Sequence, residues 1–149
     1  MSVNTATARY HGLGKDGEGH VSTPSGVIDA PYGYATRFED EAGTNPEEMI
    51  AAAHAACFTM ALSFALAKAG HNDGNLNTMA AVTLAKDGEG FAITRSALKL
   101  TASVPGIDAQ DFARIADEAK ANCPVSKLLN CEITLDHEMV EERAEDEVE

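Results

Sequence analysis

The chain has 149 residues, of which 44% are hydrophobic, and it carries a formal net charge of −13 at pH 7. This length and apolar content are typical of one globular domain with its own core, and they argue against a disordered chain. The negative charge disfavours nucleic acid and anionic membrane surfaces as partners. We expect a single α+β domain over residues 1–139, followed by a solvated acidic tail over residues 140–149.

The cysteines and histidines limit the chemistry that the chain can carry. The three cysteines, Cys57, Cys123 and Cys131, are an odd number without a short Cys-x-x-Cys spacing. This pattern argues against a disulfide-stapled secreted domain and against a zinc site. The five histidines are scattered without ligand spacing, so we expect neither a metal nor a cofactor. Residues 1–10 show no signal peptide, and a reducing cytoplasm fits.

The first third of the chain predicts short strands joined by glycine-rich turns. Residues 6–10 alternate loosely in polarity, and residues 18–23 have strand composition. Between them, Gly12-Leu-Gly-Lys-Asp-Gly17 matches the dinucleotide pattern G-x-G-x-x-G, which must lead into a helix to bind a pyrophosphate. Because a strand follows here, we interpret the run as a hairpin loop. A further short strand is predicted over residues 34–38.

The longest predicted element is a helix over residues 46–68, around which the rest of the chain is organised. Asn45 is a suitable N-cap, and Pro46 suits the first helical position. Glu47 places negative charge at the positive end of the helix dipole, and Gly70 supplies a left-handed stop.

This helix is apolar almost all the way round, whereas a surface helix shows a single apolar stripe. We therefore expect it to be buried, either centrally or against a second subunit. The run is long enough to cross a membrane, but it contains His54, Thr59 and Ser63, is rich in alanine and has no basic flank. We expect no membrane span.

The second half predicts a hairpin, a helix and a last strand. Strands are expected over residues 79–85 and 91–104, followed by a helix over residues 109–121. Asp108 can cap this helix, with Asp111 in the capping-box position. Its apolar face is formed by Phe112, Ile115, Ala116 and Ala119.

A short helix over residues 125–129 and a strand over residues 131–139 complete the predicted chain. The order of elements indicates an α+β fold with a mostly antiparallel sheet, and not a doubly wound one.

The three cysteines lie in different predicted environments. Cys131 falls on the apolar face of an alternating strand, so we interpret it as core. Cys123 precedes Pro124 at a break between helices, where free N–H groups lower a thiol pKa, and this position fits a reactive thiol and a structural one equally. Cys57 lies mid-helix, where nothing local lowers its pKa, so it needs a charged partner such as Arg37.

Several separated motifs resemble the OsmC/Ohr family of osmotically inducible and organic hydroperoxide resistance proteins. They are Val21-Ser-Thr-Pro-Ser-Gly-Val27, Pro31-Tyr-Gly-Tyr-Ala-Thr-Arg37-Phe-Glu39, Gly43-Thr-Asn-Pro-Glu47-Glu48, Ala52-Ala-His54-Ala-Ala-Cys57-Phe58, Val104-Pro-Gly-Ile-Asp108 and Asn122-Cys123-Pro-Val-Ser126-Lys127. The motifs around Cys57 and Cys123 resemble the OsmC branch more than the Ohr branch. The resemblance covers nearly the whole chain short of the acidic tail, which is longer than in the family.

The resemblance implies an OsmC/Ohr-like fold with a long buried central helix, in an intertwined homodimer with active sites at its interface. It implies a thiol-dependent peroxidase that reduces organic hydroperoxides in oxidative and osmotic stress defence. Cys57 would be the peroxidatic cysteine and Cys123 the resolving one, and the two would form a disulfide. Arg37 and Glu47 would match the family's arginine and glutamate. An external thiol or dithiol, such as a lipoylated protein, would reduce the disulfide.

The implied roles make chemical sense. An arginine beside Cys57 favours the thiolate and can hydrogen-bond the leaving oxygen, while a carboxylate paired with it fixes the guanidinium. Apolar residues near the site, such as Phe38, Phe58 and Met60, would favour a bulky alkyl hydroperoxide over hydrogen peroxide.

Spacing along the helix adds a hypothesis about the subunits. Glu47 and Cys57 are ten residues apart (57 − 47), or about 15 Å along a continuous helix. We therefore expect Arg37 and Glu47 of one subunit to serve Cys57 of the other. His54 shares a helix face with Cys57, and we expect it to pack or to form hydrogen bonds.

Other classes of function remain open from the residues alone. A cysteine hydrolase or acyltransferase would need a base and an oxyanion hole near Cys57, for which His54 is the single candidate base. A non-catalytic, stress-induced dimer that binds hydrophobic ligands would function without the Cys57 thiol.

Overall fold

The computed structural model describes residues 1–141 of the chain. The chain divides into two compact units, Met1–Met49 and Ile50–Glu149. The single domain expected over residues 1–139 stays a prediction. The expected acidic tail over residues 140–149 lies, from residue 142 onward, outside the described residues.

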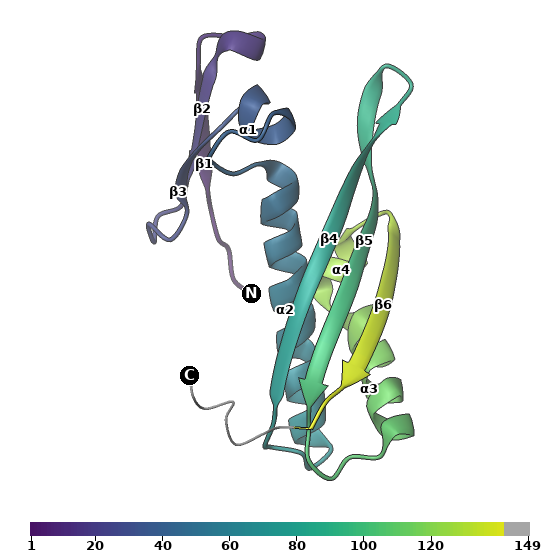
Figure 1. Ribbon diagram of the computed structural model, residues 1–149. Coiled ribbons are helices and arrows are strands. Elements are labelled where there is room, and N and C mark those ends of the chain that lie inside the picture. Colours follow the sequence, from purple (N-terminus) through teal and green to yellow (C-terminus); the bar gives the residue numbers. More distant parts are fainter. Residues whose placement is uncertain (142–149) are drawn as a thin grey trace. The chain divides into compact units, whose positions relative to one another are not determined.

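The unit Met1–Met49 contains a small antiparallel sheet. Its strands are β1 (Thr7–His11), β2 (Glu18–Ser22) and β3 (Asp29–Tyr32), in that order (Figure 1). The short 3-10 helix η1 (Gly14–Asp16) lies in the loop between β1 and β2. Because β1 and β2 pair antiparallel around this loop, the interpretation of the glycine-rich run as a hairpin loop is confirmed.

Residues 34–38 form a helix, α1 (Tyr34–Phe38), and the prediction of a strand there is wrong. Local hydrogen bonds outweigh the strand preference of this aromatic segment. The backbone N–H of Gly33 donates to Thr36 Oγ1 at 2.7 Å, and that hydroxyl donates to the Gly33 carbonyl at 3.0 Å. The rings of Tyr34 and Phe38, one helical turn apart, lie 5.1 Å from each other and support the same turn.

The long helix α2 (Pro46–Lys68) begins and ends where the sequence predicts. Pro46 is its first residue, and Gly70 has a φ of 97°, a left-handed conformation that a residue with a Cβ rarely adopts. α2 is a single helix without a break over its 23 residues.

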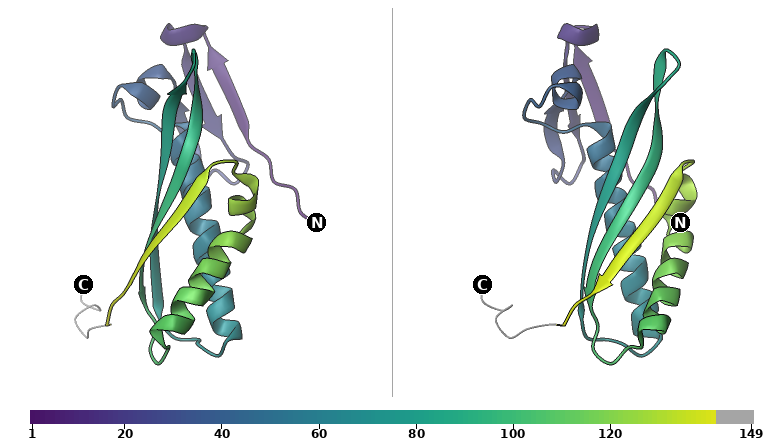
Figure 2. Two further views of the ribbon diagram at one scale, coloured as in Figure 1. Left: turned by 90° about the vertical axis from the view of Figure 1, so that its right-hand side faces the viewer. Right: turned by 45° about the vertical axis from the view of Figure 1, so that its right-hand side comes forward.

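The unit from Ile50 onward contains the second sheet. Its strands are β4 (Asn75–Asp87), β5 (Gly90–Ser103) and β6 (Glu132–Met139), in that order. β4 and β5 form the predicted antiparallel hairpin, whereas β6 pairs parallel to β5. The parallel pairing requires a crossover, which α3 (Ala109–Asn122) and α4 (Pro124–Leu128) supply. α2 and α3 lie on one face of this sheet (Figure 2).

The core of this unit lies between that sheet face and the two helices. Its fully or nearly fully buried residues are Phe58, Leu62, Leu66, Leu98, Leu100, Ala102, Val104, Phe112, Ile115, Ala116, Ala119 and Cys123. The predicted apolar face of α3 is therefore confirmed. The predicted capping box is not: Asp108 is the N-cap residue, but its side chain makes no capping hydrogen bond. The Asp111 side chain instead forms an exposed ion pair, with its Oδ1 3.6 Å from Arg114 Nη2.

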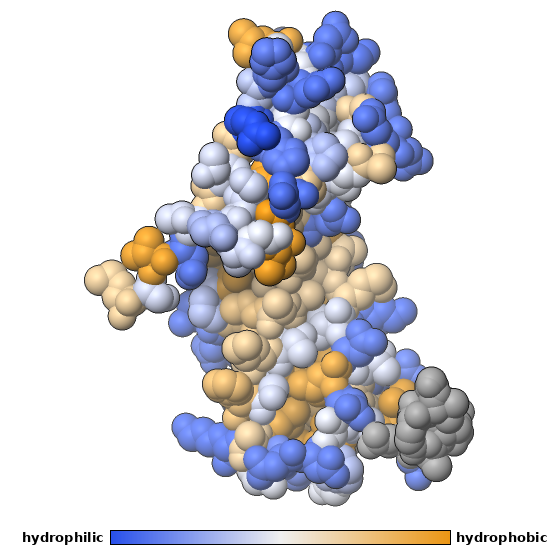
Figure 3. Space-filling view, turned by 90° about the vertical axis from the view of Figure 1, so that its left-hand side faces the viewer, coloured by the Kyte–Doolittle hydropathy of each residue, from blue (hydrophilic) through white to orange (hydrophobic). Residues whose placement is uncertain are grey.

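Within this chain α2 is buried along one stripe. The expected burial against a second subunit stays a prediction for its other faces. The buried residues His54, Phe58, Leu62 and Leu66 follow one another at every fourth position and face the core. On the other side, Met60 is 62% exposed and Phe64 is 70% exposed. Figure 3 faces this side of the molecule, and hydrophobic residues gather along α2 there.

By length and composition alone, α2 could cross a membrane. An 18-residue window of the helix has a mean hydropathy of 1.8, and 22% of that window is buried. A helix at the core of a folded domain passes the same test. The buried stripe of α2 packs against protein and includes the polar side chain of His54, so the absence of a membrane span stays our prediction.

Candidate active site

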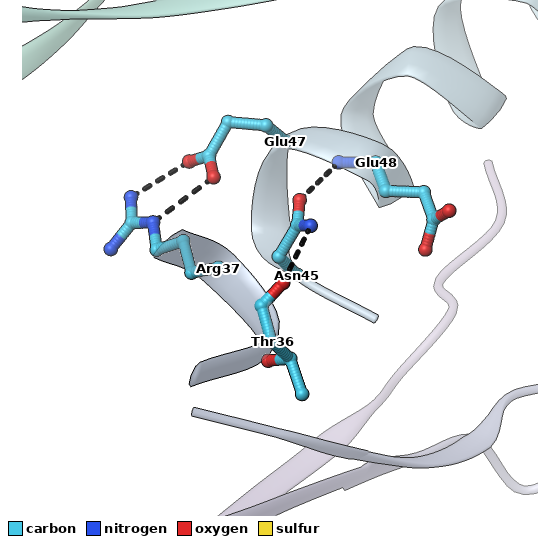
Figure 4. Close-up of polar contacts among 5 residues, drawn as sticks. All are labelled: Thr36, Arg37, Asn45, Glu47 and Glu48. Carbon is cyan, nitrogen blue, oxygen red and sulfur yellow. Dashed lines mark hydrogen bonds and ion pairs between the residues drawn. The ribbon is translucent and has the colours of Figure 1, made fainter. Parts of the chain in front are cut away.

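The structure joins two of the predicted site residues, Arg37 and Glu47, in a two-armed ion pair (Figure 4). Arg37 Nε donates to Glu47 Oε1 at 3.0 Å, and Arg37 Nη2 donates to Glu47 Oε2 at 2.7 Å. Such a pair fixes the plane of the guanidinium as well as its position. The hydrogen bonds that Arg37 donates to Glu47 raise the pKa of Arg37, so the guanidinium keeps its positive charge.

Asn45 holds the two halves of this ion pair in place. Its Oδ1 accepts a hydrogen bond from the Glu48 N–H at 2.7 Å and thereby caps the first turn of α2, which carries Glu47 (Figure 4). Its Nδ2 donates to the Thr36 carbonyl at 3.5 Å, next to Arg37 in α1. The predicted N-cap is confirmed, and the same side chain ties α1 to the start of α2.

An apolar pocket opens beside Arg37. The pocket has a volume of about 350 Å³ and lies wholly within the first unit. Its larger lining residues are the aromatic Tyr10, Tyr32, Tyr34 and Phe38 and the basic Lys15 and Arg37. A guanidinium has five N–H donors, of which the pair with Glu47 uses two. The pocket can therefore hold an alkyl or aryl group while Arg37 donates to an attached oxygen.

The second unit brings together the other two predicted site residues. Cys57, in α2, is half-buried, and Cys123, between α3 and α4, is fully buried. Both are free thiols, and each shifts the pKa of the other, as side chains that lie close together do. The backbone N–H of Val125 acts to lower the pKa of both thiols. Two neighbouring reduced thiols can form a disulfide once one of them is oxidised.

The two thiols differ in how easily they ionise. Burial raises the pKa of Cys57, the Val125 N–H acts in the opposite direction, and the hydrogen bond with Cys123 raises it again. Burial also acts to raise the pKa of Cys123, but the hydroxyl and N–H of Ser126, with Cys57 and Val125, outweigh it and lower that pKa. Because each thiol is among the causes of the other's pKa shift, the two titrate as a pair. Within residues 50–141 the thiolate is therefore favoured on Cys123, and Cys57 needs a further positive charge to become the nucleophile.

His54 lies beside the thiols in a buried polar cluster. It is fully buried, and its Nδ1 and Nε2 lie 2.6 Å from Ser96 Oγ and 2.8 Å from Ser126 Oγ. Burial lowers the pKa of His54, so the ring is neutral at pH 7. The expectation of a hydrogen-bonding role is confirmed. The two serines were missed, although the spacing of Cys123 and Ser126 matches that of an N-cap and its third helical residue.

Other predicted neighbours of the site are placed differently. Phe58 is fully buried in the core, and its expected role in substrate selection stays a prediction. Phe38 is 43% exposed and lines the pocket beside Arg37. Cys131, expected in the core, directly precedes β6 and is only half-buried.

Comparisons with known proteins agree with this geometry. Residues 38–138 match the family described as OsmC-like protein. The chain is 56% identical to peroxiredoxin OsmC of Escherichia coli (strain K12) over 133 residues, which cover 89% of this chain and 93% of that protein. It is 28% identical to organic hydroperoxide resistance protein-like 1 of Staphylococcus saprophyticus, over 91% of this chain and 95% of that one.

The structure is also similar to solved structures of this kind. The organic hydroperoxide resistance protein OhrB of Bacillus subtilis superposes with a TM-score of 0.67 at 27% identity, over 90% of this chain and 98% of that one. The expected OsmC/Ohr-like α+β fold with a long central helix is confirmed. The higher identity to peroxiredoxin OsmC also confirms the expected branch.

Proposed function

The chain belongs to the OsmC family, and we propose that it is a cysteine-dependent peroxidase that reduces organic hydroperoxides to alcohols. The observation that carries the proposal is the pair of interacting free thiols, Cys57 and Cys123, in a chain 56% identical to a peroxiredoxin. Its cellular role is defence against oxidative and osmotic stress in the cytoplasm.

The first half-reaction takes place at Cys57. The thiolate attacks the terminal oxygen of the hydroperoxide, so that an S–O bond forms while the O–O bond breaks. The leaving alkoxide takes up a proton and departs as the alcohol, and Cys57 becomes a sulfenic acid. A guanidinium donor at the leaving oxygen stabilises the developing negative charge, which is the role we assign to Arg37.

The second half-reaction takes place between the two cysteines. The Cys123 sulfur attacks the sulfenic sulfur of Cys57, a disulfide forms, and the hydroxyl leaves as water. An external thiol or dithiol then restores both thiols by disulfide exchange. A lipoylated protein, which carries such a dithiol, is the reductant we propose.

The functional unit that we propose is a homodimer with an active site at each end of its interface. α2 is continuous, so Glu47 and Cys57 are separated by about 15 Å along its axis. An ion pair with Glu47 cannot at the same time lie within hydrogen-bonding distance of Cys57 on that helix. We assign the Arg37–Glu47 pair of one subunit to Cys57 of the other, where it supplies the positive charge that the nucleophile needs.

The exposed face of α2 supports this arrangement. A shallow groove on the second unit is lined by Ala55, Ala56, Thr59, Met60, Ser63, Phe64 and Thr78. It carries two large exposed apolar side chains and no charged one. Removing such surface from water stabilises an interface by about 25 cal/mol per Å². A second copy of α2, rich in alanine, can approach this face closely.

The function is tested by comparing substrates. We expect kcat/KM for cumene hydroperoxide to exceed that for hydrogen peroxide by roughly ten- to hundred-fold, because the aryl group fills the pocket beside Arg37. The measurement is peroxide consumption with a dithiol reductant. Phe38→Ala should narrow this preference, while Val27→Ala, an exposed apolar residue off the pocket, should leave it unchanged. Equal rates for both peroxides would contradict the assigned pocket.

A further inference from the structure

A chain of buried hydrogen bonds ends on the sulfur of Cys123. Among the described residues the buried polar side chains are those of His54, Ser96, Ser103 and Ser126. Ser96 Oγ lies 2.6 Å from His54 Nδ1, and His54 Nε2 lies 2.8 Å from Ser126 Oγ. The Ser126 hydroxyl in turn donates to Cys123 Sγ at 3.5 Å. Three separate elements, β5, α2 and α4, contribute to this chain.

When Cys123 is ionised, the chain can run in one direction only. A thiolate accepts hydrogen bonds and donates none, so the Ser126 hydroxyl must donate to it. The Ser126 oxygen then accepts from His54 Nε2–H. A neutral imidazole has one donor and one acceptor nitrogen, so Nδ1 accepts from the Ser96 hydroxyl. The buried histidine is thus held in one tautomer by the charge state of the thiol.

Ser126 also reaches the sulfur with its backbone. Its N–H donates to Cys123 Sγ at 3.4 Å, with Cys123 in the N-cap position of α4. The same residue therefore supplies two donors, and burial makes each of them stronger than it would be in water. Among the described residues, the other titratable groups near Cys123 are Cys57 and His54, both from α2. No buried carboxylate or ammonium group of the described residues competes with these donors.

We propose that Ser126 is a catalytic residue of the resolving half-reaction, and that His54 is the positioning residue that aims its hydroxyl at Cys123. This inference rests on the proposed roles of Cys57 and Cys123. In the step itself, the Cys123 thiolate attacks the sulfenic sulfur of Cys57, the S–S bond forms and the S–O bond breaks. The departing hydroxide takes up a proton and leaves as water. The Ser126 hydroxyl stabilises the thiolate that starts this attack.

Loss of the hydroxyl should slow this half-reaction and spare the other. Without one charge-assisted donor, the thiolate fraction of Cys123 at pH 7 falls, and disulfide formation should slow by about ten-fold. The rate should recover at higher pH, where Cys123 ionises without help. The Cys57 sulfenic acid then persists for longer, so excess hydroperoxide should convert more of it to sulfinic acid.

Single-turnover kinetics on the full-length protein test the proposal. The parent, Ser126→Ala, Ser126→Thr and Ser103→Ala receive one equivalent of cumene hydroperoxide. Sulfenic acid on Cys57 is followed with a dimedone probe, and disulfide formation is followed by intact mass, from pH 6 to about pH 9. Ser103 is the matched control, because it is also a buried serine of β5. It lies seven positions (103 − 96) from Ser96, and an odd spacing places it on the opposite face of the strand.

The expected result separates the two steps. Ser126→Ala forms sulfenic acid at the parental rate and closes the disulfide about ten-fold more slowly at pH 7, with a pH profile displaced upward. Ser126→Thr keeps the hydroxyl and restores the rate, and Ser103→Ala behaves as the parent. His54→Gln retains an N–H donor toward Ser126 and should resolve faster than His54→Leu.

Two outcomes would overturn the role of Ser126. A third would overturn the proposed peroxidase function as well. Disulfide formation in Ser126→Ala with the parental rate and pH profile removes the assigned role of the hydroxyl. Slowing by the same factor at every pH reduces Ser126 to a packing residue. If the parent itself forms no sulfenic acid on Cys57, the proposed function fails together with this inference.

Discussion

Cys57→Ser is expected to lose hydroperoxide turnover by a factor on the order of 10³ or more, since it removes the nucleophile. A serine hydroxyl at this position is un-ionised at neutral pH and attacks peroxide oxygen poorly. The measurement is steady-state consumption of cumene hydroperoxide with a dithiol reductant. Cys131→Ser is the control, because Cys131 is also a half-buried free cysteine but lies outside the thiol pair.

The same variant separates the peroxidase from its competitors. A dimer that binds hydrophobic ligands without catalysis needs no thiol, so it would keep its function in Cys57→Ser. The serine is nearly the size of the cysteine, and the position is only half-buried, so the fold should tolerate the change. Consumption at the parental rate in a folded Cys57→Ser protein would make the central cysteine a packing residue and refute the assigned chemistry.

Arg37→Met is expected to slow sulfenic acid formation by roughly 10²- to 10³-fold, because it removes both the charge that favours the thiolate and a donor to the leaving oxygen. Arg37→Lys should recover only part of this loss, since an ammonium cannot reproduce the two-armed pair with Glu47. The rate of the first half-reaction, measured with excess protein, is the readout. A parental rate in Arg37→Met would contradict the assigned role.

Mixing two defective proteins tests whether this arginine acts across the subunit interface. Arg37→Met keeps Cys57 and Cys57→Ser keeps Arg37, so a mixed dimer has one site with both residues only if the site is shared between subunits. After random exchange of equal amounts, about a quarter of the parental activity should return. No recovery, in a mixture whose heterodimers are seen by native mass spectrometry, would place the arginine and the thiol in one chain.

The elements predicted correctly from the sequence are those with local signals. The start of α2 follows from Asn45 and Pro46, and its end follows from Gly70. The buried face of α3 follows from a 3.6-residue period, and the β4–β5 hairpin follows from apolar segments around a glycine-containing turn. Caps, periods and turns involve residues near each other in the chain, which a single sequence displays directly.

The features that could not be predicted from the sequence depend on contacts between residues far apart in the chain, or on side-chain hydrogen bonds that composition does not indicate. The aromatic and β-branched residues of α1 favour a strand, while the Gly33–Thr36 hydrogen bonds decide for a helix. The apolar composition of α2 does not tell which faces this chain covers. The chain from Ser96 through His54 to Ser126 joins three elements, and its members are separated by up to 72 positions.

The most direct test of the account is the product of one turnover in Cys123→Ser. This variant is treated with one equivalent of cumene hydroperoxide, and its intact mass and peptide map are recorded. The account predicts one added oxygen atom on Cys57 and one equivalent of the alcohol, while the parent gives a Cys57–Cys123 disulfide. Alcohol released with Cys57 unmodified, or with the oxygen on another residue, would contradict the account.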